Sequence, residues 1–140
     1  MEGWERREGD PPFDFARKLE KFYDLKQTAG VFWDNYAPGD TQLFHESARY
    51  GANWKQLQDA ARSVLHGLAD QGDAVVGDHV ASTTLGFVGR LERLTGEIVA
   101  FQARSQLGWR CAGGIWKIRH EMNYAWEVDP KTIEPLLGRR

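Results

Sequence analysis

The chain has few of the features that cross-link a protein, attract nucleic acid or hold it in a membrane. It has a single cysteine, Cys111, so no disulfide can form within it. The chain has 18 Lys and Arg residues and 20 Asp and Glu residues, and the basic residues form no stripe to which phosphates could bind. We therefore expect no nucleic-acid partner. The uncharged runs are far shorter than the roughly 20 apolar residues of a membrane-spanning helix, so we expect no membrane partner either.

Two further absences bear on location and on cofactors. The first residues lack the basic and apolar regions of a secretory signal, which predicts a cytoplasmic protein in a reducing compartment. The four histidines show no short His-x-x-x-His spacing, and the chain has no Gly-rich phosphate loop. We therefore expect neither a metal site nor a cofactor.

Aromatic side chains, in contrast, are plentiful: the 140 residues include six Trp, seven Phe and four Tyr. One interpretation is a core built from large residues. The other is that some of them line a ligand cavity, because such cavities have mostly apolar walls and a few polar groups. Composition leaves both interpretations open.

The polar residues 1–12 end in two prolines and predict a flexible N-terminal arm, in which Trp4 alone is suited to docking. A helix that ends by Gly30 is predicted to follow, and Asp14 is placed to offset its dipole. The helix is indicated by four large residues at helical spacing, Phe15, Leu19, Phe22 and Tyr23.

The middle of the chain predicts a hairpin and a second helix. Residues 31–36 and 41–47 are β-prone and flank a Pro-Gly turn. Gly51 indicates a chain break and Asn53 an N-cap, so we expect a helix from Asn53 to Ala69. Its apolar face would consist of Trp54, Leu57, Ala61, Val64, Leu65 and Leu68.

From residue 74 the hydrophobic pattern changes from helical to alternating. Three long β-like segments, 74–91, 96–111 and 115–127, are separated by short turns that contain glycine. The apolar side of the second segment consists of Val99, Phe101, Ala103 and Leu107. Helices first and an antiparallel meander afterwards predict an α+β fold whose helices cover one face of the sheet.

The last segment reads GGIWKIRHE over residues 113–121, with VDP following at 128–130. This run resembles the C-terminal signature of SnoaL-like, ketosteroid isomerase-related proteins of the nuclear transport factor 2-like superfamily. Residues 77–81 resemble the start of an earlier strand in the same proteins. The resemblance covers residues 51–130 and departs from the family at Met122, where many relatives carry a second histidine.

The resemblance implies a cone-shaped, curved antiparallel β-sheet, covered on its concave face by the N-terminal helices and enclosing a hydrophobic pocket. It implies a single domain over residues 13–130, followed by a C-terminal tail over residues 131–140. It also implies a homodimer through the outer face of the sheet, and chemistry on a hydrophobic small molecule without a cofactor.

Strand alternation selects candidate residues in the last segment. It places Lys117, Arg119, Glu121 and Asn123 on one face, and Trp116, Ile118, His120, Met122 and Tyr124 on the other. The second face is more apolar, so we expect it to face the helices. There the His120 imidazole would be partly desolvated and neutral, able to act as a general base or acid. The alternative is a core histidine that is hydrogen-bonded to the backbone or to Tyr124.

Three further residues are candidates. Asp34 lies among aromatic residues before a Pro-Gly turn, where the resemblance implies a general base and where burial would raise its pKa; Asp is also common at strand ends. Tyr23 would donate a hydrogen bond to an oxyanion, or simply belong to the core. Asp78 and His79 alternate along a strand, and the more apolar neighbours of His79 favour it as the inward residue.

These observations lead to one hypothesis and one alternative. The hypothesis is an isomerase, lyase or cyclase that moves protons on a polyketide-, terpenoid- or steroid-like molecule, with Asp34 or His120 as the base. Tyr23, Tyr124 or His79 would hold an oxyanion or return the proton. The predicted cavity walls are Phe32, Trp33, Trp54, Phe87, Phe101, Trp116 and Met122. The alternative is a non-catalytic module that binds a ligand or associates with other chains.

Overall fold

A computed structural model describes residues 2–37 and 40–138. In chain order the elements are η1 (Glu2–Trp4), α1 (Phe15–Leu19), β1 (Val31–Ala37), β2 (Asp40–Phe44), α2 (Ser47–Asp59), β3 (Ala61–Leu68), β4 (Asp73–Val76), β5 (Val80–Arg93), β6 (Ile98–Ala112), β7 (Ile115–Glu127), α3 (Pro130–Ile133) and η2 (Glu134–Leu136). Within the described ranges, none of these helices has the length and apolar character needed to cross a membrane.

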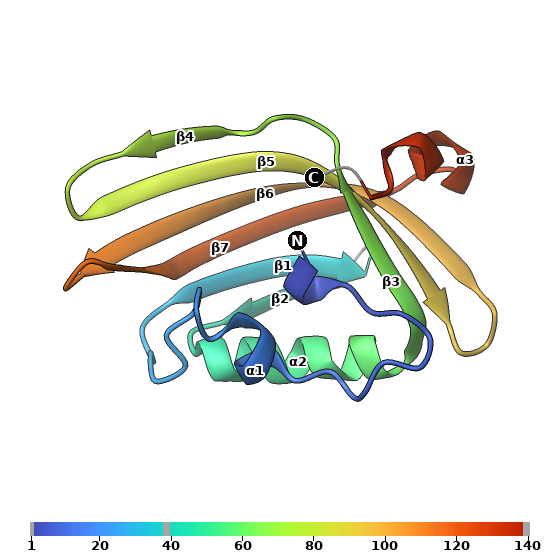
Figure 1. The fold of residues 1–140 in the computed structure, drawn as a ribbon, viewed down its shortest axis with the longest axis horizontal. Helices are drawn as coiled ribbons and strands as arrows, with labels where there is room; N and C mark the ends of the chain where they lie inside the picture. The colour runs from blue at the N-terminus through green and yellow to red at the C-terminus, as the bar shows by residue number, and fades with distance from the viewer. Residues whose placement is uncertain (1, 38–39, 139–140) are drawn as a thin grey trace.

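The strands form one mixed sheet in the order β2-β1-β7-β6-β5-β3, and β4 pairs with β5 beside β3. Every pair is antiparallel except β1 with β7, which run parallel. The long strands β5, β6 and β7 are joined by short turns; the β6–β7 turn uses two glycines with positive φ, Gly113 and Gly114. Figure 1 shows the curved sheet arching over α1 and α2. The predicted α+β cone is confirmed, with one parallel pair added to the meander.

The second helix lies earlier in the chain than its sequence pattern predicts. The span Ala61–Leu68, expected to be helical, is strand β3 and pairs with β5. This part of the prediction is wrong because Val64 and Leu68 share one face of a helix and equally one face of a strand. Gly51 does not break the chain but lies inside α2, where a Cβ would come within 2.3 Å of the Phe15 ring. Its role is to let α1 and α2 approach closely.

The first helix is much shorter than expected. The Asp14 carboxylate accepts a hydrogen bond from the Arg17 amide at 3.0 Å, so Asp14 is the N-cap of α1. The helix then ends at Leu19, because the chain turns to join the sheet. Tyr23 forms a parallel bridge with Ile118 of β7, and this pairing replaces the further helical turns that the apolar spacing predicts.

Both ends of the described chain pack against the sheet. Arg6 and Val64 exchange two backbone hydrogen bonds of 2.9 and 2.8 Å, which extends the sheet beyond edge strand β3. Trp4 packs against the aromatic core. At the other end Ile133 is 2% exposed and packs on Val88 and Ala100. The polar composition of residues 1–12 predicts a flexible arm because it does not reveal these backbone pairings.

A β-bulge in β7 decides which of its side chains face the helices. In the pairing of β6 with β7, Gly108 lies opposite His120, but the next residue of β6 lies opposite Ile118, so Arg119 is an extra residue. An extra residue reverses the alternation beyond it. Ile118 is buried as expected, but past the bulge it is Glu121, not His120, that points inward.

The core under the concave face is mainly aromatic. Its buried residues are Phe13, Phe15, Leu19, Tyr23, Phe32, Tyr50 and Ile118. Fully burying one such large apolar side chain contributes about 1.5–3 kcal/mol, so the cluster is a main source of stability between helices and sheet. The aromatic richness of the chain is therefore explained in part by the core, and in part by the cavity described next.

Candidate functional site

A cavity of about 1040 Å³ lies between the concave face of the sheet and the helices. Its walls come from the inward positions of β3, β5, β6 and β7, and from η1 and α2 on the opposite side. Most of the lining is apolar, as in ligand-binding cavities generally. The strand residues that form this apolar lining include Val64, Leu68, Leu85, Phe87, Leu91, Val99, Phe101, Ala103 and Leu107. The inward side of β6 is the one that alternation predicts.

Five polar side chains converge at one part of this cavity: Tyr23, Asp34, Tyr50, Glu121 and Asn123. The Tyr23 hydroxyl donates a short hydrogen bond to Oε2 of Glu121. The Tyr50 hydroxyl lies 2.9 Å from Oε1 of Glu121 and 3.2 Å from Oδ2 of Asp34. The Asn123 amide nitrogen lies 2.6 Å from the same Glu121 oxygen and 3.4 Å from the same Asp34 oxygen. One phenol and one amide therefore link the two carboxyl groups.

This arrangement restricts where the protons of the cluster can lie. The Tyr50 hydroxyl has one hydrogen, so it donates to only one of the two carboxyl groups at a time. Its contacts with both Glu121 and Asp34 are complete only when the other carboxyl group carries a proton and donates it to the phenol oxygen. The geometry therefore favours a carboxyl pair that holds a proton over two bare carboxylates.

The cluster is buried, and burial governs its electrostatics. Glu121 is 5% exposed and Asp34 is 1% exposed. Burial raises the pKa of Glu121 above its ordinary value of 4.5, while the hydrogen bonds from Tyr23, Asn123 and Tyr50 act in the opposite direction. Burial, followed by the charge of Glu121, raises the pKa of Tyr23 and of Tyr50 well above 10. Both phenols therefore stay protonated at neutral pH and remain hydrogen-bond donors.

Replacing Glu121 by Gln is expected to stabilise the chain at neutral pH and to flatten part of its pH dependence. Because burial raises the Glu121 pKa above 4.5, the folded state binds this proton more tightly than the unfolded state. The free energy of unfolding therefore falls as pH rises from about 4.5 through the raised pKa. The Gln variant has no such proton, so its free energy of unfolding should not fall in this way. The fall in the wild type amounts to about 1.4 kcal/mol for each unit by which the Glu121 pKa is raised. Urea unfolding between about pH 4.5 and 8 measures it.

The matched control for this measurement is Glu134→Gln, which changes an exposed carboxyl group in η2, outside the cavity lining. Its unfolding curve should keep the wild-type pH dependence. A Glu121→Gln variant that is less stable than wild type by the same amount at every pH would contradict the expectation, because it would show a carboxylate held ionised throughout.

Several predicted site residues do meet at this cavity. Asp34 and Tyr23, predicted as base and oxyanion donor, both line it and both contact the cluster. Of the predicted walls, Trp54, Phe87 and Phe101 line the cavity as well. β1 brings Asp34 into place because it runs parallel to β7 with Asp34 paired to Asn123.

Three predicted catalytic residues lie elsewhere. His120 and Tyr124 are exposed on the outer face of the sheet, because the bulge at Arg119 reverses the alternation from which they were assigned. His79 is exposed in the turn between β4 and β5, and neither it nor Asp78 faces the cavity. The expectation of one strand from residue 74 to 91 placed His79 inside an element that in fact ends at Val76.

Four predicted wall residues are also misplaced. Met122 is 49% exposed on the outer face, again because of the bulge. Trp33 stacks on Tyr124 outside the cone, with ring centroids 6.4 Å apart. Phe32 is fully buried in the core, and Trp116 lies outside the cavity lining, close to the β6–β7 turn. An aromatic residue in an inward segment is therefore a weak predictor of a cavity wall.

Three members of the cluster were missed. Glu121 and Asn123 were assigned to the outer face, and nothing local in the sequence marks the bulge that turns them inward. Tyr50 was hidden because Gly51 was interpreted as a chain break. A signal for it did exist: Tyr50, Trp54 and Leu57 are spaced four and three residues apart, which places them on one face of a helix.

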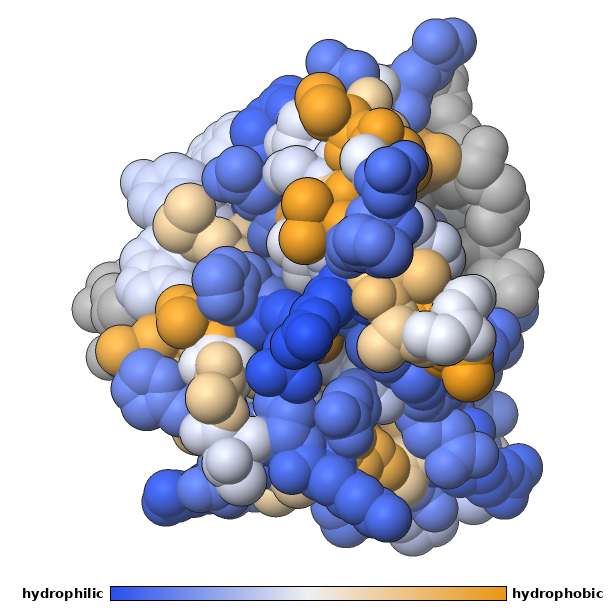
Figure 2. All heavy atoms as spheres, turned by 90° about the vertical axis from the view of Figure 1, so that its left-hand side faces the viewer, coloured by the Kyte–Doolittle hydropathy of each residue, from blue (hydrophilic) through white to orange (hydrophobic). Residues whose placement is uncertain are grey.

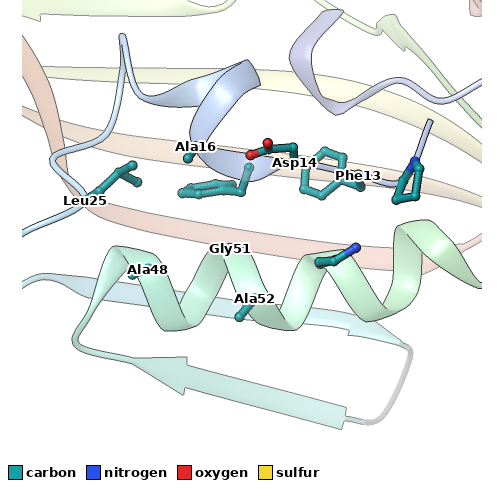
Figure 3. Close-up of a pocket in the computed structure, with 10 residues that line it drawn as sticks. Phe13, Asp14, Ala16, Leu25, Ala48, Gly51 and Ala52 are labelled. Carbon is teal, nitrogen blue, oxygen red and sulfur yellow. The ribbon is translucent and has the colours of Figure 1, made fainter. Parts of the chain in front are cut away.

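A second, smaller hollow of about 440 Å³ lies between α1 and α2 (Figure 3). Its lining is mostly apolar, and its charged residues are already engaged within the fold. Asp14 caps α1, and the Lys55 ammonium pairs with Asp59. Because no member of the polar cluster reaches this hollow, the larger cavity is the candidate functional site.

The groups around the cluster suit proton transfer more than metal binding. Over the described part of the chain, no set of three or more His, Cys, Asp or Glu side chains is arranged to hold a metal ion. The neighbours of the two carboxyl groups are phenols and an amide. Phenols that keep their protons can stabilise a developing negative charge on a ligand oxygen.

No protein-family model matches the chain, and no curated protein matches its sequence. Solved structures do share its fold. A nuclear transport factor 2-like superfamily protein from Salmonella enterica is similar over 77% of this chain and 75% of its own, with a TM-score of 0.64 and 12% identity. The association domain of CaMKII from C. elegans is similar over 76% of this chain and 78% of its own, with a TM-score of 0.53 and 13% identity.

A third structure carries an enzyme description. It is a suggested aromatic ring hydroxylase from Novosphingobium aromaticivorans, similar over 82% of this chain and 80% of its own, with a TM-score of 0.62 and 15% identity. Identities this low establish the fold alone. The chain is thus an α+β cone with the nuclear transport factor 2-like fold, a fold whose solved examples include both an enzyme-like protein and association domains.

Proposed function

We propose that the chain is an enzyme that moves protons on a hydrophobic small molecule in the main cavity, as an isomerase, lyase or cyclase that uses no cofactor. The observation that carries the proposal is the pair of buried carboxyl groups, Asp34 and Glu121, linked through Tyr50 at the wall of a mostly apolar cavity. Two carboxyl groups in one site commonly divide the roles of acid and base, because their environments separate their proton affinities.

Asp34 is assigned the role of base, and Glu121 that of the group that holds a proton, in keeping with its raised pKa. The Asp34 carboxylate removes a proton from a carbon next to a substrate carbonyl, and the electron pair of that C–H bond moves onto the carbonyl oxygen. Glu121 or the Tyr23 phenol donates a hydrogen bond to this oxyanion. Asp34 then returns the proton to another carbon, which isomerises the substrate, or to a departing hydroxyl group, which dehydrates it.

A nitrobenzisoxazole probe tests the proposal without knowledge of the natural substrate. A base removes its C–H proton, the N–O bond breaks, and a coloured cyanophenolate is released. A positioned, desolvated carboxylate should open the ring with saturable kinetics, at least about a hundredfold faster than the same concentration of free acetate. A rate no higher than that of acetate, or a rate that is unchanged when the chain is unfolded in urea, would show that this site does not contain the catalytic base.

A second candidate function is association between copies of the chain through the outer face of the sheet. Past the bulge, β7 turns large side chains outward, and they join neighbours on β1 and β2. We call these residues the outer patch: Val31, Trp33, Leu43, Met122, Tyr124 and Trp126. The end of the molecule where the β4–β5 and β6–β7 hairpins turn is mixed: Figure 2 shows apolar side chains among hydrophilic ones there, and the hairpins expose Val75, Val76, Val80 and Ile115. A contiguous exposed apolar patch is typical of an interaction surface.

Replacing Tyr124 by Glu is expected to weaken self-association if the outer patch is a homodimer interface. Tyr124 is 55% exposed and its ring lies between those of Trp33 and Trp126, so the substitution places a charge in the middle of the patch. Loss of a central aromatic contact should raise the dimer dissociation constant at least about thirtyfold. Sedimentation equilibrium measures it, with the exposed Val75→Glu as the control that should leave the constant unchanged. A wild-type chain that is monomeric at micromolar concentration would rule the interface out.

A further inference from the structure

The polarity of the main cavity is uneven along its length. Glu121 and Asn123 are opposite Leu107 and Ser105 of β6, and this is the part where the carboxyl pair and the phenols lie. Further along β6, the inward positions become apolar: Ala103, Phe101 and Val99 follow one another. The neighbouring strands continue the apolar stretch with Leu85, Phe87, Leu91, Val64 and Leu68. The cavity therefore has one buried polar cluster and a mostly apolar extension that runs from it. The polar residues along the extension include the buried His66 of β3, whose ring lies against Phe87 and Phe101, and the exposed Glu127 of β7.

The apolar extension is long. From Ser105 to Val99 the chain advances by six residues along β6, which corresponds to about 20 Å of extended strand. It ends at Ile98, which is 43% exposed, beside the Arg93–Glu97 ion pair of 2.9 Å. The extension thus leads from the buried polar cluster to solvent at the β5–β6 turn. Because tetrahedral angles make each C–C bond of about 1.5 Å advance an extended chain by only about 1.25 Å, a straight alkyl chain of roughly 17 carbons would span it.

The charged groups at the polar end of the cavity determine which ligand head group can bind there. Glu121 is contacted by two phenols and an amide, and within the described residues it forms no ion pair with Lys, Arg or His. The Lys and Arg side chains that line the cavity make their contacts away from the cluster: Lys18 donates to the Glu5 carbonyl, Lys21 lies over the Phe22 ring, and Arg93 pairs with Glu97. A carboxylate or phosphate head at the cluster would meet the buried carboxyl groups without a balancing cation, at a large desolvation cost. An uncharged oxygen can accept a hydrogen bond from a phenol.

We propose that the cavity takes an uncharged, straight-chain carbonyl compound, whose carbonyl oxygen accepts from the Tyr23 hydroxyl in place of Glu121 and whose alkyl chain lies along β5 and β6 toward Ile98. The proposal rests on the site of the proposed function and adds the substrate class to it.

The test is a binding series with straight-chain methyl ketones from octanone to eicosanone, followed by tryptophan fluorescence, to which Trp4, Trp54 and Trp109 in the cavity wall contribute. Each added methylene that is buried should tighten binding about fourfold. The gain should stop when the chain reaches the solvent beside Ile98. The fatty acids of equal length, measured at neutral pH, should bind at least about tenfold more weakly, since their head would be an unpaired buried anion.

A variant that shortens the extension sharpens the test. Ala103 is 1% exposed and lies one inward position beyond Ser105, so Ala103→Phe should stop the gain in affinity several carbons earlier. Ser82→Phe, an exposed position on the outer side of β5, should leave the series as it is in wild type. If Ala103→Phe does not fold, the dependence of wild-type affinity on chain length still tests the proposal.

The outcomes separate this proposal from the proposed function. Affinity that does not depend on chain length, equal binding of the fatty acids, or tighter binding of a steroid enone than of every methyl ketone would each overturn the substrate class. Because binding is measured without turnover, a failed ring-opening assay does not affect this result. If the chain opens the nitrobenzisoxazole ring but its affinity for methyl ketones does not depend on chain length, the substrate class is rejected and the proposed function stands.

Discussion

Replacing Asp34 by Asn is expected to slow ring opening of nitrobenzisoxazole by a factor of about 10² to 10⁴, because an amide cannot accept the proton that the carboxylate removes. The substitution is nearly isosteric, and an amide oxygen still accepts from Tyr50 and Asn123. Because the change keeps the size of this buried side chain and the hydrogen bonds that it accepts, the Asn variant should fold and bind the probe as the wild type does. The loss should therefore appear in kcat, with little change in KM.

Glu121→Gln is the informative comparison, because it alters the other carboxyl group of the same pair. Ring opening needs only a base, so this variant should stay within about tenfold of the wild-type rate. If Glu121→Gln abolishes the reaction and Asp34→Asn does not, the roles of the two groups are exchanged. If neither substitution changes the rate, the cluster is structural and the chain is better understood as a binding or association module.

Periodicity predicted the outline of this fold well where one pattern dominated. The bounds of the β-like segment 115–127 match those of β7, and the hairpin of β1 and β2 follows from β-prone segments that flank a turn. It failed where one pattern fits two structures. Val64 and Leu68 serve a strand as well as a helix, and only pairing with β5 decides between them.

The candidate site depended on a feature that the sequence does not mark. Arg119 is an ordinary strand residue, and only the geometry of β6 against β7 makes it the extra residue of a bulge. Because of this extra residue, Glu121 lies at the cavity wall and His120 does not. The candidate for proton chemistry on this strand is therefore a carboxyl group and not a histidine. Asp34 and Tyr23 could be found from sequence, because each is a polar residue among aromatic neighbours in a segment that the fold buries.

The N-terminal residues show most clearly how tertiary contacts override composition. Trp4 lies 5.2 Å from the Trp54 ring and 6.2 Å from the Tyr50 ring, measured between centroids, and it lines the cavity beside the polar cluster. Its carbonyl oxygen accepts a 2.7 Å hydrogen bond from the buried Gln58 side chain. These contacts make the segment a cover over the phenols rather than a free arm.

Trp4→Ala is therefore expected to destabilise the chain by about 3 kcal/mol, since removing a large aromatic ring from a packed cluster leaves a cavity behind. Trp126→Ala, on the outer face and 38% exposed, should cost less than about 1 kcal/mol in a urea titration. The larger consequence concerns the site. Burial is the main reason why the Glu121 pKa is raised, so admitting water beside Tyr50 should move that pKa back toward 4.5. The pH-dependent fall in stability would then shrink in Trp4→Ala and persist in Trp126→Ala. Equal stability of the two variants would show that residues 1–12 are the flexible arm that their composition suggests, and that the polar cluster is covered by the helices alone.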